Sequence, residues 1–119
     1  MKKRRVRKEL KRGEIWVVNF DPTIGSEIKK TRPAIIISSQ PFNRLRRTVV
    51  VMSLSSAHHQ TEFPLLIAIA SVSGGRPSVA VVDQLKVAAK ERFIRKLGTA
   101  TAGEMEQISD ALATLLSIG

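Results

Sequence analysis

The chain has 119 residues, with 20 Lys and Arg residues against 10 Asp and Glu residues, and so carries a formal net charge of +10. This length is enough for one domain with one core but is too short for two ordinary domains. The chain has no cysteine, which excludes disulfides and cysteine-based metal sites, and its apolar runs are far shorter than the ~20 residues of a membrane-spanning helix. No apolar segment follows the basic N-terminus, so we expect no signal peptide and a cytoplasmic location.

The positive charge is concentrated at the N-terminus. Residues 1–13 (MKKRRVRKELKRG) hold eight basic residues and one acidic residue, a net charge of +7. Such an excess is typical of nucleic-acid-binding proteins, with an anionic membrane or an acidic protein segment as further possible partners. A solvated extension without a specific role fits equally well. We therefore divide the chain into a basic extension, residues 1–12, and a domain, residues 13–119.

Five β-rich runs, separated by turn residues, follow the extension. They are residues 14–20, 34–38, 48–54, 63–70 and 78–85. Pro33 can begin the second strand but should not lie inside a central strand. We interpret residues 40–47 as a polar connection and residues 93–97 as a short additional strand ending at Gly98. The spacing is typical of a small barrel or sandwich and not of βαβ units.

The C-terminal segment has a helical pattern. Thr101 and Glu104 match the S/T-x-x-E capping box, in which each side chain bonds a backbone N–H of the first turn. Apolar residues then recur at helical spacing, at Met105, Ile108, Leu112, Leu115 and Leu116. The prediction is a mainly β domain of five to seven strands with a C-terminal amphipathic helix packed on a bent sheet.

Common catalytic and metal-binding motifs are missing. The two histidines, His58 and His59, are adjacent and would point to opposite sides of a strand, and no metal-ligand spacing occurs. Gly74 and Gly75 lack the GK[ST] ending of a phosphate-binding loop, and no GxSxG nucleophile motif is present. We therefore expect no metal or other cofactor.

Basic, hydroxyl and carboxylate side chains cluster near predicted strand ends. The candidates are Glu27, Lys29, Lys30, Arg32, Ser55, Ser56, His58, Asp83 and Gln84, with the last two ending the fifth strand. Arginine can grip phosphate oxygens in a bidentate manner, a hydroxyl adds a hydrogen bond and a carboxylate can accept a proton. RNA supplies its own nucleophile, the 2′-OH. These residues therefore favour phosphodiester binding or cleavage, and the pattern leaves open which of the two.

Each candidate also has a structural interpretation. Arg32 could be a surface arginine or pair with Glu27, and Ser55 could cap its own strand. Asp83 and Gln84 could close a turn. Trp16 lies in an apolar run, so we expect it to belong to the core and not to stack on bases.

Several motifs together resemble the MazF/PemK-type toxins of bacterial toxin–antitoxin systems. They are RGEIWVVNFDPTIGSE, TRPAIIIS, an FN pair, VVVMSLSS and VAVVDQLKV, followed by LG and the terminal helix. They occur in the family's order from about Gly13 onward, and the DPTxGSE…RP stretch is the most specific.

The resemblance implies an SH3-like barrel that works as a homodimer and is inhibited by a cognate antitoxin. It also implies a metal-independent, sequence-specific endoribonuclease that cuts single-stranded mRNA by 2′-OH attack, leaves 2′,3′-cyclic phosphate and 5′-OH ends, and arrests growth. Arg32 matches the family's central arginine and Glu27 its carboxylate, and Ser55 stands where the family usually has Thr. With these as catalytic residues, the other candidates are expected to bind RNA.

The chain departs from some relatives at two further positions. Ser26 stands where some members have His, and Val81 where some have Arg, so the catalytic set is smaller. A noncatalytic nucleic-acid binder, or a gyrase-inhibiting toxin of the same barrel fold, remains the alternative.

Overall fold

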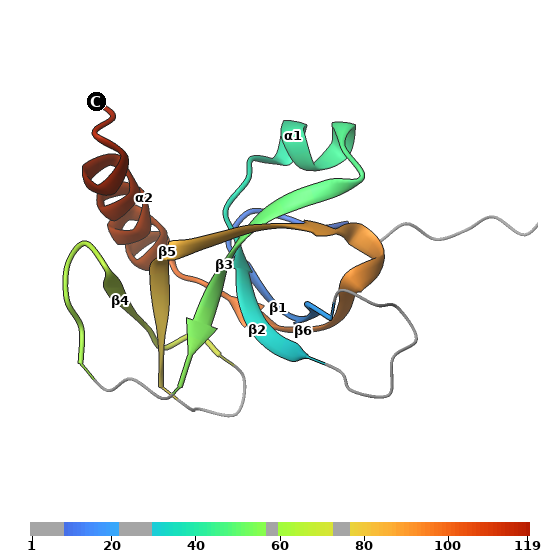
Figure 1. The fold of residues 1–119 in the computed structure, drawn as a ribbon, viewed down its shortest axis with the longest axis horizontal. Coiled ribbons are helices and arrows are strands. Elements are labelled where there is room, and N and C mark those ends of the chain that lie inside the picture. Colours follow the sequence, from blue (N-terminus) through green and yellow to red (C-terminus); the bar gives the residue numbers. More distant parts are fainter. Residues whose placement is uncertain (1–8, 22–29, 57–59, 73–76) are drawn as a thin grey trace, which may run out of the picture.

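The computed structural model describes residues 9–21, 30–56, 60–72 and 77–119 (Figure 1). Six strands and two α-helices make up this part of the chain. They are β1 (Glu14–Asn19), β2 (Thr31–Ile36), α1 (Gln40–Leu45), β3 (Thr48–Ser55), β4 (Leu66–Ile69), β5 (Ser78–Ala89), a 3₁₀ turn η1 (Lys90–Arg92), β6 (Phe93–Thr99) and α2 (Ala102–Leu116). No helix among the described residues is long and apolar enough to cross a membrane.

The strands form one antiparallel sheet in the order β4-β5-β3-β2-β1-β6. The long strand β5 bends sharply partway along its length (Figure 1). At this bend its register with β3 shifts, because Ala80 pairs with Leu54 whereas Leu85 pairs with Met52. The four residues between Ala80 and Leu85 therefore face a single β3 residue, and extra residues of this kind bend a strand and increase its twist. The bend gives the sheet the shape of a half-barrel.

The curved sheet has an apolar core on each face. The first lies between the sheet and α2 and includes Ile15, Ile35, Met52, Leu54, Val82, Met105 and Ile108. The second lies inside the curve and includes Leu10, Val18, Ala34, Ile36, Val49, Val51, Ala88 and Phe93, with Trp16 packed edge-on against Phe93. Alternate residues of β1, β2 and β3 enter the two cores, as expected for strands buried on both faces. The predicted core role of Trp16 is confirmed.

Asn43 holds α1 in place. It is almost fully buried, and its amide nitrogen donates to the carbonyl oxygens of Leu10, at 3.1 Å, and Ser38, at 3.0 Å. The Ser38 hydroxyl donates to the Asn43 side-chain oxygen and accepts from the Val50 N–H. One amide therefore joins the N-terminal segment, α1 and β3.

Glu14 connects the start of β1 to β6. Its carboxylate accepts hydrogen bonds from the Lys11 N–H and the Trp16 indole and lies 3.0 Å from the Lys96 ammonium group. Burial alone would raise the pKa of Glu14, but these bonds and the Lys96 charge outweigh it and lower the pKa. Glu14 is therefore held ionised beside its partners.

The helix α2 begins with the predicted capping box. Thr101 accepts from the Glu104 N–H, and Glu104 accepts from the Thr101 N–H. The Glu104 carboxylate also accepts from the Ala70 N–H and the Ser71 hydroxyl, both at 2.7 Å. The cap therefore also fastens α2 to the segment that follows β4.

The predicted fold class is confirmed, but some element bounds are wrong. Residues 40–47 contain the helix α1, because Pro41 suits a first helical turn as well as a loop. The strand β2 begins two residues before Pro33, which is tolerated because only residues 34–36 pair with β3. The strand β4 is shorter than residues 63–70, and β6 extends through Gly98 to Thr99.

Candidate active site at the end of β2 and β3

Arg32 and Ser55 lie at the same end of two neighbouring strands. Ala34 pairs with Ser53, and the next pairs follow the same antiparallel register. Arg32 and Ser55 each lie two residues beyond the Ala34–Ser53 pair, toward the same end of the two strands. The hydrogen-bonded pairing stops at Ala34, next to Pro33, which has no N–H to continue it. The two strands therefore bring the guanidinium and hydroxyl candidates to one end of the sheet, where β2 begins and β3 ends.

Both side chains belong to the concave face of the sheet. Residues two apart on a strand share a face, so Arg32 shares the face of Ala34, and Ser55 shares the face of Ser53 and Val51. Ala34 and Val51 are buried in the core inside the curve, whereas Arg32 is exposed and Ser55 half-buried. The candidate pair thus lies at the open rim of that core, where a ligand can reach it.

Ser53 is a polar residue that sequence reasoning did not single out. It lies two residues inward from Ser55 and is nearly fully buried. Its hydroxyl makes no hydrogen bond to any described residue. A serine within the run VVVMSLSS gives no sequence signal for this position, because the strand pattern alone does not show which hydroxyl is buried.

Lys30 and Ser56 extend the same rim. Lys30 comes directly before β2, and its carbonyl accepts the Phe20 N–H at 2.8 Å. Ser56 follows β3, and both residues are exposed. The structure therefore places these two predicted RNA-binding residues beside Arg32 and Ser55.

Phe20 and Lys86 are a second pair that the sequence did not reveal. The Lys86 ammonium group lies 4.7 Å from the centroid of the Phe20 ring, within cation–π range. Phe20 packs against the core inside the curve, next to Lys30. A second basic side chain therefore reaches this end of the barrel from β5. No local pattern predicts this contact, because the bend of β5 creates it.

Asp83 and Gln84 do not end a strand, as the sequence had indicated. They lie within β5, which continues to Ala89, and both are exposed at the bend. Ser55 pairs with Val79, so these polar residues lie farther along β5 than the position facing Ser55. A register shift lets the strand continue past them, which explains why they resemble a turn.

Three of the predicted site residues, Glu27, Lys29 and His58, lie outside the described residues. Their chain positions adjoin this rim, since residues 22–29 lead into β2 and residues 57–59 follow β3.

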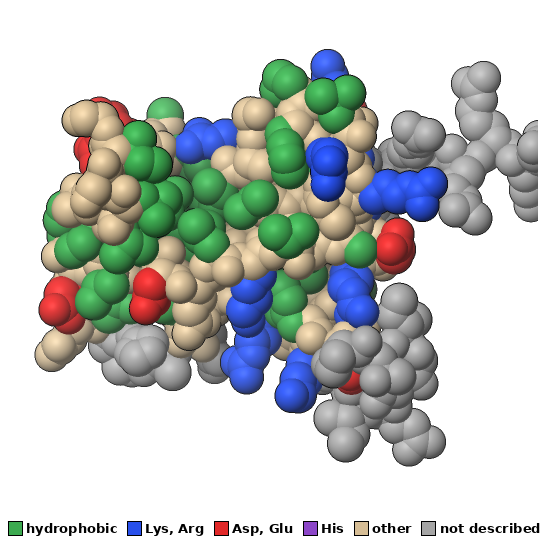
Figure 2. All heavy atoms as spheres, turned by 45° about the horizontal axis from the view of Figure 1, so that its top comes forward, with side chains coloured by type: hydrophobic (Ala, Val, Ile, Leu, Met, Phe, Trp, Pro, Cys, Tyr) green, Lys and Arg blue, Asp and Glu red, His purple; other side chains and the backbone are tan. Residues whose placement is uncertain are grey.

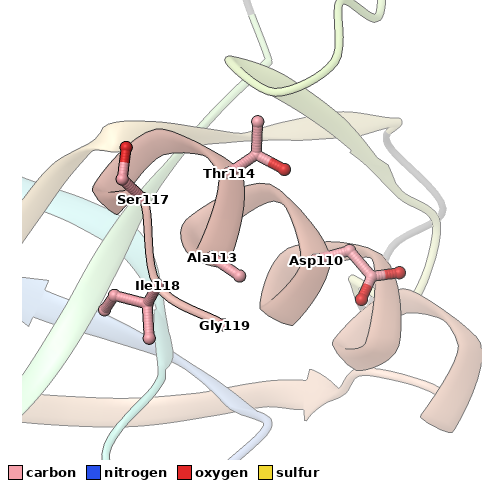
Figure 3. A pocket seen from close by; sticks show the side chains of 6 residues that line it. All are labelled: Asp110, Ala113, Thr114, Ser117, Ile118 and Gly119. Carbon is pink, nitrogen blue, oxygen red and sulfur yellow. The ribbon is translucent and has the colours of Figure 1, made fainter.

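A surface pocket lies elsewhere, at the C-terminal end of α2 (Figure 3). Ser117 adopts a left-handed conformation, and the Ile118 N–H returns to the Ala113 carbonyl, a helix-ending arrangement that turns the last residues alongside the helix. Asp110 is the one charged side chain of its lining. This pocket has the hydroxyl groups of Thr114 and Ser117 but, unlike the β2–β3 rim, no basic side chain in its lining. Within the described ranges, no three His, Asp or Glu residues are grouped so that they could hold a metal ion.

Comparison with known proteins identifies the family. Residues 11–116 match the family described as PemK-like, MazF-like toxin of type II toxin–antitoxin systems. Endoribonuclease MazF9 of Mycobacterium tuberculosis is 30% identical over 115 residues, covering 92% of this chain and 98% of that protein. The chain therefore belongs to the PemK-like, MazF-like toxin family, which confirms the resemblance found in the motifs.

Solved structures agree on the fold. An endoribonuclease from a mycobacterial species superposes with a TM-score of 0.75 at 22% identity, covering 96% of this chain and 97% of that chain. A mycobacterial endoribonuclease in complex with its cognate antitoxin gives a TM-score of 0.73 at 23% identity, covering 92% of this chain and 96% of that chain. At these identities the likeness establishes the half-barrel with its C-terminal helix.

Proposed function

We propose that this protein is an endoribonuclease toxin that cuts single-stranded RNA, in particular mRNA, at specific sequences and arrests growth. The observation that supports the proposal is the β2–β3 register of a PemK-like, MazF-like chain, because Arg32 and Ser55 each lie two residues beyond the Ala34–Ser53 pair, toward the same end of the sheet. The relative of 30% identity that aligns over most of this chain is named an endoribonuclease. Because mRNA is the proposed substrate, the protein acts in the cytoplasm.

The proposed reaction needs no metal. The RNA 2′-oxygen attacks the adjacent phosphorus, the P–O5′ bond breaks, and the products carry a 2′,3′-cyclic phosphate and a 5′-OH. The 2′-OH loses one proton and the 5′-oxygen gains one. Arg32 stabilises the charge on the phosphate oxygens, because a guanidinium is a strong bidentate donor but a poor proton donor. Ser55 donates a hydrogen bond to the same group, and Glu27 provides a carboxylate for proton transfer.

The remaining candidates bind the RNA around this centre. Lys30 and Ser56 lie at the rim itself, and Lys29 and His58 adjoin it in the chain. Asp83 and Gln84 contribute from the bend of β5, where exposed carboxylate and amide groups can contact base edges. We retain the division into a basic extension, residues 1–12, and a toxin domain, residues 13–119.

The antitoxin is proposed to inhibit by occupying this rim. One relative of the same fold was solved in complex with its cognate antitoxin. An acidic segment that is disordered before binding suits a basic rim, because opposite charges speed the encounter and define the orientation.

A homodimer is proposed to form through an apolar face. Figure 2 shows hydrophobic side chains gathered across one side of the molecule, from α2 over the sheet toward α1. Exposed apolar residues of α1, of β5, and of α2 and the segment after it are Phe42, Leu45, Leu85, Val87, Leu115, Leu116 and Ile118. Scattered exposed apolar residues are ordinary, but a contiguous patch marks an interaction surface. A second copy of the chain is the occupant that we propose.

The test is cleavage of a long mixed-sequence RNA in EDTA. Wild type is compared with Arg32→Ala and with Arg95→Ala, which removes an exposed arginine on β6 opposite Val17. Primer extension locates the cuts, and chemical analysis identifies the new ends. We expect discrete cuts with cyclic-phosphate ends from wild type and Arg95→Ala, and none from Arg32→Ala.

Intact RNA after incubation with folded wild-type protein would contradict the proposal. RNA binding without cleavage would then favour a noncatalytic nucleic-acid binder. Inhibition of gyrase would favour a gyrase-inhibiting toxin of the same fold. If Arg32→Ala cleaves RNA as well as wild type does, the protein is an endoribonuclease but Arg32 is not one of its catalytic residues.

A further inference from the structure

A second group of basic side chains lies at the opposite end of β3 from Ser55. Arg44, in the last turn of α1, and Arg46 and Arg47, between α1 and β3, are exposed, and the Lys90 N–H donates to the Arg47 carbonyl at 2.9 Å. We call these four residues the basic end. The strand β3 runs from Thr48, next to the basic end, to Ser55 at the rim. These seven residue steps of about 3.3 Å separate the basic end from the β2–β3 rim by roughly 20 Å. The basic end is therefore separate from the proposed catalytic centre.

The N-terminal extension begins at this surface. Leu10 is buried, and its carbonyl is held by Asn43 of α1. Glu9 lies 3.6 Å from the Arg44 guanidinium. Residues 1–8, which contain six Lys and Arg residues and no acidic residue, are therefore attached to the chain next to α1.

Basic groups also occupy the region between the basic end and the rim. The Arg92 guanidinium, just after Lys90, donates to the carbonyl oxygens of Asn19 and Asp21 at the end of β1. Lys86, four residues before Lys90, lies over Phe20. These contacts fold the C-terminal half of β5 and η1 over the end of β1. Positive charge thus extends from the rim toward α1.

The charge distribution is asymmetric across the molecule. The helix α2 contains Glu104, Glu106 and Asp110 and no Lys or Arg. Figure 2 shows acidic side chains mainly on the α2 side and basic side chains toward the other side. A polyanion is therefore attracted to the half of the molecule that carries the basic end.

We propose that the basic end binds the phosphate backbone of RNA outside the cleaved sequence, so that long RNA is held more tightly than a short oligonucleotide. This inference rests on the proposed function, which supplies RNA as the substrate. Contacts with phosphates carry no sequence information, so they raise affinity without altering the cleavage sequence. Each such contact adds about 0.7 to the salt dependence of single-strand binding.

The test compares two RNAs and two variants. One RNA is short and covers only the cleaved sequence, and the other extends far beyond it, each with a 2′-O-methyl group that blocks cleavage. The variant Arg46→Gln/Arg47→Gln/Lys90→Gln removes three charges from the basic end. The control Ala102→Glu/Gln107→Glu/Thr114→Glu makes the same change in net charge at exposed positions on α2.

We expect the basic-end variant to bind long RNA at least tenfold more weakly than wild type at low salt. The slope of log K against log salt should fall by about 2, from three lost contacts. Binding of the short RNA should be unchanged, and unmodified short RNA should be cut at the wild-type rate, which also shows that the variant is folded. The α2 control should bind long RNA within twofold of wild type.

Other outcomes would overturn the inference. Equal weakening by both variants would assign the effect to net charge alone, and equal weakening for both RNAs would assign it to the cleavage site. Tighter binding of wild type to phosphatidylglycerol vesicles than to long RNA would indicate a membrane surface instead. If wild type cuts no RNA but binds long RNA through the basic end, the proposed function fails and the binding surface stands.

Discussion

Glu104 ties the start of α2 to the end of β4, and its replacement by alanine is expected to destabilise the fold. Its carboxylate accepts bonds from the Thr101 N–H, the Ala70 N–H and the Ser71 hydroxyl, at 2.9, 2.7 and 2.7 Å. Hydrogen bonds to charged groups contribute about 1.5–3 kcal/mol when buried, but Glu104 is half-exposed, so we take roughly 0.7 kcal/mol for each. The expected loss is about 2 kcal/mol.

The measurement is thermal and urea unfolding of Glu104→Ala, with two companion variants. A loss of about 2 kcal/mol lowers the Tm of a domain of this size by roughly 8 °C. Thr101→Ala removes only part of the cap and should cost about 1 kcal/mol. Glu106→Ala, exposed on the same helix, should cost less than about 0.5 kcal/mol. Equal losses for Glu104→Ala and Thr101→Ala would refute the tie to β4.

The same prediction has a pH dependence with a defined sign. Burial alone would raise the pKa of Glu104, but the bonds from Ser71, Thr101 and Ala70 outweigh it and lower the pKa. The unfolded chain titrates near the ordinary glutamate pKa of about 4.3. The stabilisation is therefore fully present above that value and is lost as pH falls through the lowered pKa of the folded state. The stability gap between wild type and Glu104→Ala should narrow in acid, and a constant gap would contradict this account.

Three further predictions concern other parts of the chain. Asn43→Ala should lower the free energy of unfolding, measured in urea, by about 2–3 kcal/mol, because it leaves the buried Leu10 carbonyl without its donor. Ser39→Ala should leave this free energy nearly unchanged, because the Ser39 side chain makes no capping hydrogen bond. Gly13→Ala should lower the free energy of unfolding by about 1–2 kcal/mol, because alanine is strained at the Gly13 φ of +93°. A clash does not contribute, since the added Cβ would lie 3.7 Å from the Met105 side chain. Ser55→Thr should keep RNA cleavage, because it keeps the hydroxyl, and Ser55→Ala should lower it more than tenfold; equal activity of these two variants would exclude a role for the hydroxyl.

The sequence predicted which residues form much of the candidate site, but it did not predict how these residues are arranged in space. Arg32 and Ser55 were found as strand-end residues within family motifs, and the structure puts them at one rim. The Phe20–Lys86 contact could not be predicted, because it depends on the bend of β5. Asp83 and Gln84 were assigned to a strand end for the same reason.

The sequence by itself determined the local elements of this protein. Runs of β-branched and other apolar residues between turn residues specified most of the strands, and Thr101 with Glu104 specified the start of α2, because these patterns act over a few neighbouring residues. Tertiary structure decided which strands pair, in which register, and where β5 bends. Those choices depend on contacts between distant segments, and a shift of one residue would move Arg32 to the other face of the sheet. The rim therefore exists only in the folded sheet, although both of its central residues can be read from the chain.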